Sequence, residues 1–87
     1  MKNICLITGA AGLLGKMHAE AILETGKNIC ITDINKTNLI KLYKILKKKF
    51  PKNEIIYKKL DVTNESQIKN FFKSIRHKYF VSILINN

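Results

Sequence analysis

Three glycines at regular spacing are the first candidates for chemistry in this chain. Gly9, Gly12 and Gly15 lie in the segment TGAAGLLG, residues 8–15, between an apolar run and a helix-like run. The first backbone N–H groups of a helix lack partners and carry partial positive charge, so they attract anions. Glycine permits a tight turn and a close approach of the backbone to a ligand. The segment therefore predicts a phosphate-binding turn between a strand and a helix.

An acidic residue at the end of the next apolar run supports this interpretation. Residues 28–33 form that run and end at Asp33. A carboxylate about 20 residues after a glycine-rich turn binds the ribose hydroxyls of a dinucleotide. The phosphate-loop NTPase pattern is excluded, because it requires glycine in place of Ala10 and serine or threonine in place of Met17.

The elements that would position these residues alternate along the chain. Apolar runs predict strands, helical periodicity predicts helices, and cap residues such as Asn35 and Asn64 together with Pro51 set boundaries. On the first helix, Leu14, Met17, Ala21 and Ile22 are expected to form the apolar face. The predicted strands cover 3–8, 28–33, 54–60 and 81–85, and the predicted helices cover 13–24, 36–49 and 64–78. This alternation predicts an α/β, Rossmann-like parallel sheet of order 3-2-1-4 with right-handed crossovers.

Composition limits the alternatives. With 87 residues the chain is at most one small domain. Its net charge of +10 comes almost entirely from dispersed lysines, so we expect no nucleic-acid partner. No apolar run approaches the roughly 18 residues that a membrane span requires, so we expect no span. The first 21 residues resemble a secretory signal, but cleavage there would remove the glycine turn. Cys5 and Cys30 are expected to be free and buried, which favours a cytoplasmic location.

Four segments in the correct order resemble the N-terminal part of a short-chain dehydrogenase/reductase. They are the TGAAGLLG turn, the strand-terminal Asp33, the Asp-Val-Thr of residues 61–63 and the Leu-Ile-Asn-Asn of residues 84–87. Together they span nearly the whole chain. The resemblance implies one NAD(P)-binding Rossmann domain, of which residues 1–87 are the N-terminal part and the C-terminal catalytic part is absent.

The resemblance also implies a role for each matched residue. Asp33 would bind the adenosine ribose, and its charge would repel a 2′-phosphate, which favours NAD and makes NADP less likely. The nearby Lys36 is the reason why NADP is not excluded. Asp61 would meet the adenine amino group, unless it only caps a helix, and Val62 would pack on the ring. Asn86 would lie under the nicotinamide-side ribose. The residues expected to line the pyrophosphate are Gly9, Gly12, Leu13, Leu14 and Gly15.

Two departures leave alternatives open. The glycine spacing resembles the extended branch of nucleotide-sugar epimerases and dehydratases, whereas Asn86 and Asn87 resemble the shorter branch, which we favour. The family's catalytic Ser and Tyr-x-x-x-Lys fall beyond residue 87, and the similar pair Tyr43 and Lys47 lies on the wrong helix. We therefore assign no catalytic residue and no metal ligand in this chain.

The resulting expectation is the dinucleotide-binding portion of an NAD(P)-dependent oxidoreductase that acts on a carbonyl or alcohol. Its partners would be a small-molecule substrate and, in the full-length protein, further copies of itself. A non-catalytic nucleotide-binding module and a small basic nucleic-acid-binding protein remain the alternatives from other classes.

Overall fold

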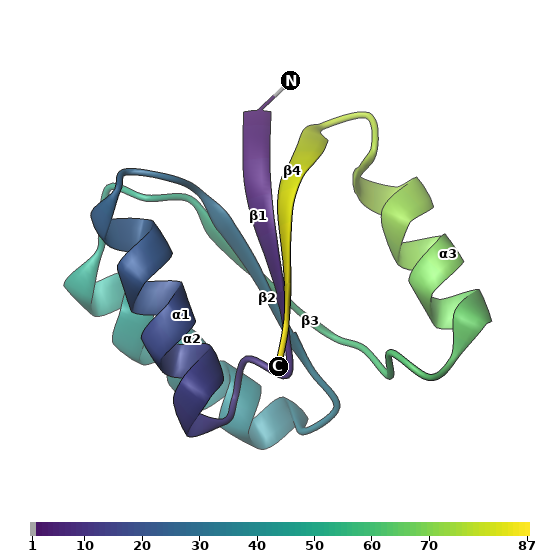
Figure 1. Ribbon diagram of the computed structural model, residues 1–87, viewed down its shortest axis with the longest axis horizontal. Coiled ribbons are helices and arrows are strands. Elements are labelled where there is room, and N and C mark those ends of the chain that lie inside the picture. Colours follow the sequence, from purple (N-terminus) through teal and green to yellow (C-terminus); the bar gives the residue numbers. More distant parts are fainter. Residues whose placement is uncertain (1) are drawn as a thin grey trace.

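The computed structural model describes residues 2–87 as a four-stranded parallel sheet with helices on both faces (Figure 1). The strand order is β3-β2-β1-β4, which confirms the predicted fold class and places β3 at one edge. The elements in chain order are β1 Lys2–Thr8, α1 Leu13–Glu24, β2 Ile29–Asp33, α2 Lys36–Lys49, β3 Ile55–Lys59, α3 Glu65–Ile75 and β4 Tyr79–Asn86.

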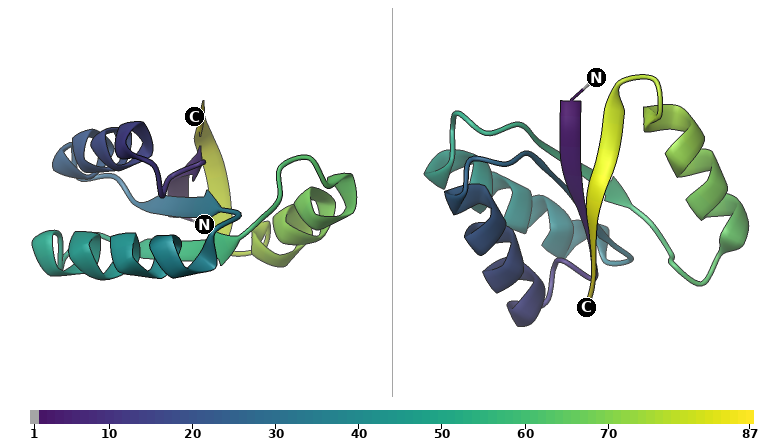
Figure 2. Two further views of the ribbon diagram at one scale, coloured as in Figure 1. Left: turned by 90° about the horizontal axis from the view of Figure 1, so that it is seen from below. Right: turned by 45° about the horizontal axis from the view of Figure 1, so that its top comes forward.

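The helices divide between the two faces of the sheet. Helices α1 and α2 lie together on one face and α3 lies on the other (Figures 1 and 2). Because successive strand residues point to opposite faces, Cys5 and Ile7 pack with α1 and α2, whereas Ile4 and Leu6 pack with α3. Both faces of β1 are thus buried, as its continuous apolar run predicts.

The buried face of α1 differs from the sequence expectation. Gly15, Ala19 and Leu23 face the core, and Leu14 and Met17 are 56% and 60% exposed. Helix α1 follows the glycine turn directly, so its first residues lie against the backbone of that turn. An added Cβ at Gly15 would come 2.6 Å from Ala10 Cα. Only small residues fit such a contact. The predicted apolar face was wrong because it was chosen from the spacing of large apolar residues. Ala21 is exposed as well, and Ile22 is partly buried.

The cap residues bring about the predicted helix starts. Asn35 Oδ1 accepts a hydrogen bond from Asn38 N at 3.0 Å, and Asn64 Oδ1 accepts one from Gln67 N at 3.1 Å. The end of α3 was predicted too late, because α3 stops at Ile75 and β4 begins at Tyr79 rather than at residue 81. Tyr79 pairs with Lys2, so β4 extends along the whole of β1.

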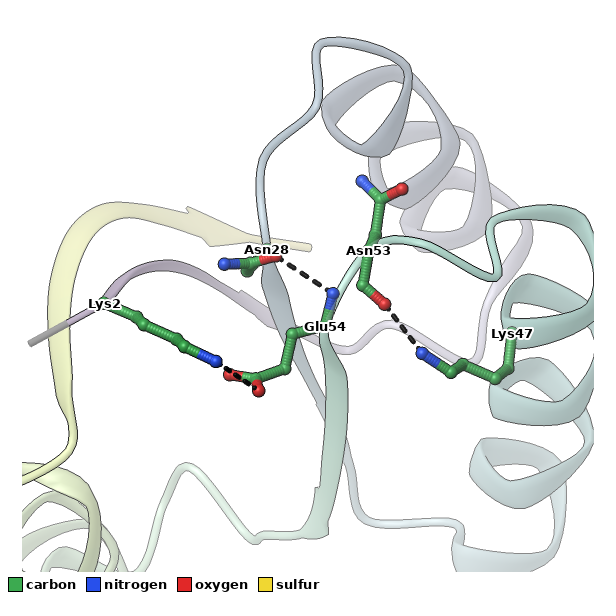
Figure 3. Close-up of polar contacts among 5 residues, drawn as sticks. All are labelled: Lys2, Asn28, Lys47, Asn53 and Glu54. Carbon is green, nitrogen blue, oxygen red and sulfur yellow. Dashed lines mark hydrogen bonds and ion pairs between the residues drawn. The ribbon is translucent and has the colours of Figure 1, made fainter.

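Polar side chains connect the elements at the amino-terminal ends of the strands (Figure 3). Lys2 Nζ donates to Glu54 Oε1 at 3.0 Å, and Glu54 N donates to Asn28 Oδ1 at 2.9 Å. Next to them, Asn53 accepts a bond from Lys47 Nζ through its backbone oxygen at 2.7 Å. These bonds hold the segment that enters β3 against β1, β2 and α2, and leave the opposite ends of the strands for the candidate site.

Candidate functional site

The glycine turn joins β1 to α1 at the carboxyl ends of the strands. Gly9 has φ +60°, and an added Cβ there would lie 2.9 Å from the backbone oxygen of Asn87. Ala10 N donates to Thr32 O at 3.0 Å, which fixes the turn to β2. Gly12 is the N-cap of α1 and has no side-chain cap. The nearest atom to a Cβ added at Gly12 would be 3.8 Å away, so there is open space beside Gly12.

The Asp33 carboxylate connects the turns that follow β1 and β2. Asp33 Oδ2 accepts a hydrogen bond from Ala11 N at 3.0 Å, and Oδ1 accepts one from Asn35 N at 2.9 Å. An ionised carboxylate has about four lone-pair sites, so further donors can still bind to it. The structure thus fixes this carboxylate beside the glycine turn, with acceptor capacity remaining.

A cavity of about 170 Å³ contains four of the predicted site residues, namely Gly9, Asp33, Asp61 and Val62. Its other lining residues are Thr8, Ile34, Leu60 and Asn87. Two carboxylates thus share the cavity with apolar side chains, a combination suited to a ligand with both an apolar ring and hydrogen-bond donors.

The Asp61 carboxylate is held in its ionised form by the residue two positions later. Asp61 Oδ1 accepts the Thr63 hydroxyl at 2.6 Å and the Thr63 N–H at 2.9 Å. These two bonds, the hydroxyl first, lower the pKa of the Asp61 carboxyl below its ordinary value. The N-cap of α3 is Asn64, not Asp61. The helix-capping interpretation of Asp61 is therefore wrong, and its carboxylate orders the turn that precedes the helix.

The two terminal asparagines take different positions. Asn86 Oδ1 accepts the Thr8 hydroxyl at 3.0 Å, and Asn87 Nδ2 donates to Thr8 O at 3.0 Å. Asn87, not Asn86, lines the cavity with Asp33. Asn86 and Val62 line a separate, mainly apolar cavity of about 190 Å³ on the α3 side.

The remaining predicted residues are not gathered into the Asp33 cavity. Gly12 and Leu13 line a third cavity between α1 and α2, Leu14 is exposed, and Gly15 is buried against the turn. Conversely, sequence reasoning missed Thr8, Ile34, Leu60 and Asn87 as lining residues. Each is adjacent in sequence to a predicted residue, and their position at strand ends could have indicated them, because carboxyl ends of parallel strands meet at one edge.

Residues 3–87 match the family model for short chain dehydrogenases, and the chain belongs to that family. The match agrees with the shorter branch that the terminal asparagines favoured. The chain is 38% identical over 84 residues to the short chain dehydrogenase/reductase dpfgG of Gibberella zeae, a match that covers 95% of this chain and 30% of that protein.

Two further proteins extend the comparison. The chain is 32% identical over 86 residues to mouse 15-hydroxyprostaglandin dehydrogenase, which is named with NAD(+), over 98% of this chain and 32% of that protein. It superposes on the NADPH dependent reductase YwfH with a TM-score of 0.90 at 22% identity, over 100% of this chain and 37% of that one. The last likeness shows the fold alone. The chain spans about a third of the length of each of these proteins.

Two structural findings bear on other functions. Over residues 2–87, no helix combines the length and apolar character needed to cross a bilayer. Within the same residues, no three histidine, cysteine or acidic side chains are grouped as metal ligands would be.

Proposed function

We propose that this chain is the cofactor-binding portion of an NAD(P)-dependent short-chain oxidoreductase. When bound, the cofactor would supply hydride transfer between its nicotinamide and a carbonyl or alcohol carbon of a small-molecule substrate. The contribution of residues 1–87 is to bind and orient the dinucleotide, and the catalytic side chains lie outside this part of the protein.

The roles of the residues follow from their positions. The free amides around Gly12 at the start of α1 would receive the pyrophosphate, with Gly9, Leu13, Leu14 and Gly15 forming the turn and the first helical residues. Asp33 would accept the adenosine ribose hydroxyls. Asp61 and Val62 would bind the adenine, and Asn86 the nicotinamide-side ribose.

We further propose that NAD is the preferred cofactor, because the Asp33 carboxylate would repel a 2′-phosphate. The complete protein is proposed to be a cytoplasmic homo-oligomer. The cofactor preference rests on the Asp33 carboxylate, the location on the free, buried Cys5 and Cys30, and the oligomeric state on the resemblance to the family.

One observation carries the proposal. A carboxylate from the end of β2 is fixed at 3.0 Å from a backbone amide of the glycine turn, at the rim of a cavity that also contains Asp61 and Val62. This contact supports the proposal because backbone amides that could receive a diphosphate adjoin carboxylates that could accept hydrogen bonds from a ribose and an adenine.

The test is an NADH titration of the full-length protein, followed by cofactor fluorescence. Asp33→Ala should weaken NADH binding about tenfold or more, because the ribose loses a charged hydrogen-bond acceptor. Glu24→Ala removes an exposed carboxylate at the far end of α1 and should leave the affinity unchanged. The proposal fails if the wild-type protein does not bind NADH, or if Asp33→Ala binds it as tightly as the wild type.

A further inference from the structure

A groove of about 360 Å³ lies between the edge strand β3 and helix α3, and we call it the β3–α3 groove. Its strand side is formed by Lys58, Lys59 and Leu60, and its helix side includes Gln67, Asn70 and Phe71. Leu60 and Phe71 are buried and supply the apolar lining, whereas the polar residues are exposed. The groove shares only Leu60 with the Asp33 cavity, so it is a separate surface from the proposed cofactor site.

The strand side of the groove has backbone groups that point away from the sheet. Within residues 2–87, β3 is the last strand on its side of the sheet. Leu60 N donates to Asp33 O on β2 at 3.0 Å. Successive residues of a strand direct their N–H and C=O groups to opposite sides, so Tyr57 and Lys59 direct theirs outward. This edge can therefore accept a further strand through main-chain hydrogen bonds.

Lys58 brings a positive charge to the groove. Ile56 and Leu60 pack on the α3 face of the sheet, and strand residues two positions apart point to the same face, so Lys58 points there as well. On the helix side, Gln67 Oε1 accepts a hydrogen bond from the backbone N–H of the Asp61 turn at 3.0 Å, and its amide nitrogen remains a donor. Asn70 supplies a second amide. These groups suit a carboxylate.

The acidic residues nearest to the groove in the chain have partners of their own. Asp61 Oδ1 accepts the Thr63 hydroxyl at 2.6 Å, and Glu65 Oε1 lies 3.0 Å from Lys69 Nζ. Among the described residues, no ion pair joins Lys58 to a carboxylate. The positive charge of the groove is therefore available to a carboxylate from outside this chain.

We propose that the β3–α3 groove binds an acidic, extended segment of a partner protein, which adds a strand to the β3 edge and places glutamate or aspartate side chains beside Lys58. Main-chain hydrogen bonds give affinity in this mode, and pockets for alternate side chains give specificity. The intervening side chains would point to the other face, where the Tyr57 and Tyr43 ring centroids are 4.8 Å apart. A second β3 edge is not the occupant, because it would bring the same positive charges.

The test of charge complementarity is fluorescence polarisation of the full-length protein with a labelled peptide of alternating glutamate and valine. Lys58→Met should weaken binding of this peptide about tenfold, because its glutamates lose a charged partner. Lys44→Met removes an exposed charge from α2 outside the groove and should leave binding unchanged. A peptide of alternating lysine and valine should not bind. Far-UV circular dichroism checks that both variants are folded.

The test of strand addition uses two N-methylated forms of the same peptide. In a strand, the glutamate amides lie on one edge and the valine amides on the other, so methylation of either set removes the donors of one edge only. One form should lose binding, because its donors to β3 are blocked, and the other form should keep it. The NADH affinity of the protein should be the same in the wild type and in Lys58→Met, since the two sites are separate.

The inference is wrong if the glutamate peptide does not bind to the wild type, or if Lys44→Met weakens binding as much as Lys58→Met. Equal behaviour of the two methylated peptides would show that no strand is added, and would also overturn it. A single-stranded oligonucleotide of the same charge that competes equally well would show a general affinity for polyanions, with the same consequence. A loss confined to Lys58→Met and to one methylated peptide supports the groove as a peptide site. None of these results depends on NADH binding, which tests the proposed function independently.

Discussion

At the scale of single residues, the three glycines of the turn have different physical reasons to be glycine. Gly9 has a left-handed backbone and Gly15 is in contact with backbone atoms of the turn, so both are required by the fold itself. Gly12 has an extended backbone with φ −79° and ψ 171°, and there is space for a side chain. The fold therefore does not require glycine at this position, which is what the proposed pyrophosphate site would lead us to expect.

Gly15→Ala tests the structural role. The new Cβ would lie 2.6–2.7 Å from the backbone of Gly9 and Ala10, which cannot move without displacing the turn. We expect a loss of about 1–3 kcal/mol in the free energy of unfolding, measured by urea denaturation. Gly12→Ala is the matched control: the nearest atom to its Cβ would be 3.8 Å away, and only the poorer N-cap, about 0.5–1 kcal/mol, should reduce the free energy of unfolding.

Gly12→Val tests the ligand role. Valine accepts the extended backbone of Gly12 but is a poorer N-cap than glycine, so the variant should fold with a loss of about 1 kcal/mol in the free energy of unfolding. The branched side chain would project from the amino-terminal end of α1, where the pyrophosphate is proposed to bind. NADH affinity in the full-length protein should fall about tenfold or more. Unchanged affinity in a folded Gly12→Val protein would contradict the proposed position of the pyrophosphate.

Sequence reasoning selected candidate residues by their chemical type, such as glycine and aspartate, or, for Val62, by the resemblance to the family. Gly9, Asp33, Asp61 and Val62 share one cavity as expected, because each follows a strand and parallel strands end at one edge. Thr8, Ile34, Leu60 and Asn87 were missed because a threonine, an isoleucine, a leucine or a second asparagine has many ordinary roles. Their place in the cavity depends on the direction of each side chain at a strand end.

At the scale of elements, Asn53 is the side chain that joins α1 to the segment that enters β3. Its Nδ2 donates to Leu23 O at 3.0 Å and to Lys27 O at 2.9 Å, which satisfies a carbonyl at the end of α1 and one in the following loop. Asn53→Ala should lower the free energy of unfolding by about 0.5–1.5 kcal/mol, because Lys27 O loses the Asn53 donor and Leu23 O keeps only the hydrogen bond from Gly26 N. Urea denaturation measures the loss, and Asn70→Ala, an exposed amide on α3, is the control.

The element boundaries that were predicted correctly depend on local contacts, and those that were not depend on tertiary contacts. The starts of α2 and α3 were predictable, because Asn35 and Asn64 bond to amides three residues later in the chain. The end of α3 and the buried face of α1 were not. The first depends on the pairing of Tyr79 with Lys2, and the second on contact between Gly15 and the turn. Both are set by neighbours that periodicity within one helix does not reveal.

At the scale of the whole molecule, Cys30 makes the free energy of unfolding depend on pH in the alkaline range. Its side chain is fully buried, and burial raises the pKa of the thiol from 9.0 to about 12. Because folding raises the pKa of this thiol, the protonated thiol contributes its full share of the free energy of unfolding below the pKa of the unfolded state. That contribution is lost as the pH rises toward and through the pKa of the folded state. In urea denaturation between pH 7 and 11, the stability advantage of wild type over Cys30→Ala should therefore shrink above pH 9. A difference that stays constant would show that the thiol does not titrate differently in the two states.

The two edges of the sheet differ in their protection against further strand pairing. The β3 edge contains the exposed Lys58 and Lys59, and charged side chains on an edge strand oppose association. The β4 edge contains no charged residue over Tyr79–Asn86, and Phe80 on it is 59% exposed. An uncharged apolar edge is a template for pairing with another chain, so the 87-residue chain expressed by itself should associate as its concentration rises.

The association can be traced to one edge by a matched pair of substitutions. Phe80→Lys places a charge on the β4 edge and should shift the chain toward monomer in sedimentation velocity across a concentration series. Tyr57→Lys makes the same kind of change on β3, where Tyr57 is 41% exposed beside the existing lysines, and should have little effect. If the unmodified chain is a cooperatively unfolding monomer at all concentrations, the β4 edge does not pair with other chains. An equal shift toward monomer with both substitutions would show that net charge causes the effect. A shift confined to Phe80→Lys would locate the contact between chains at β4.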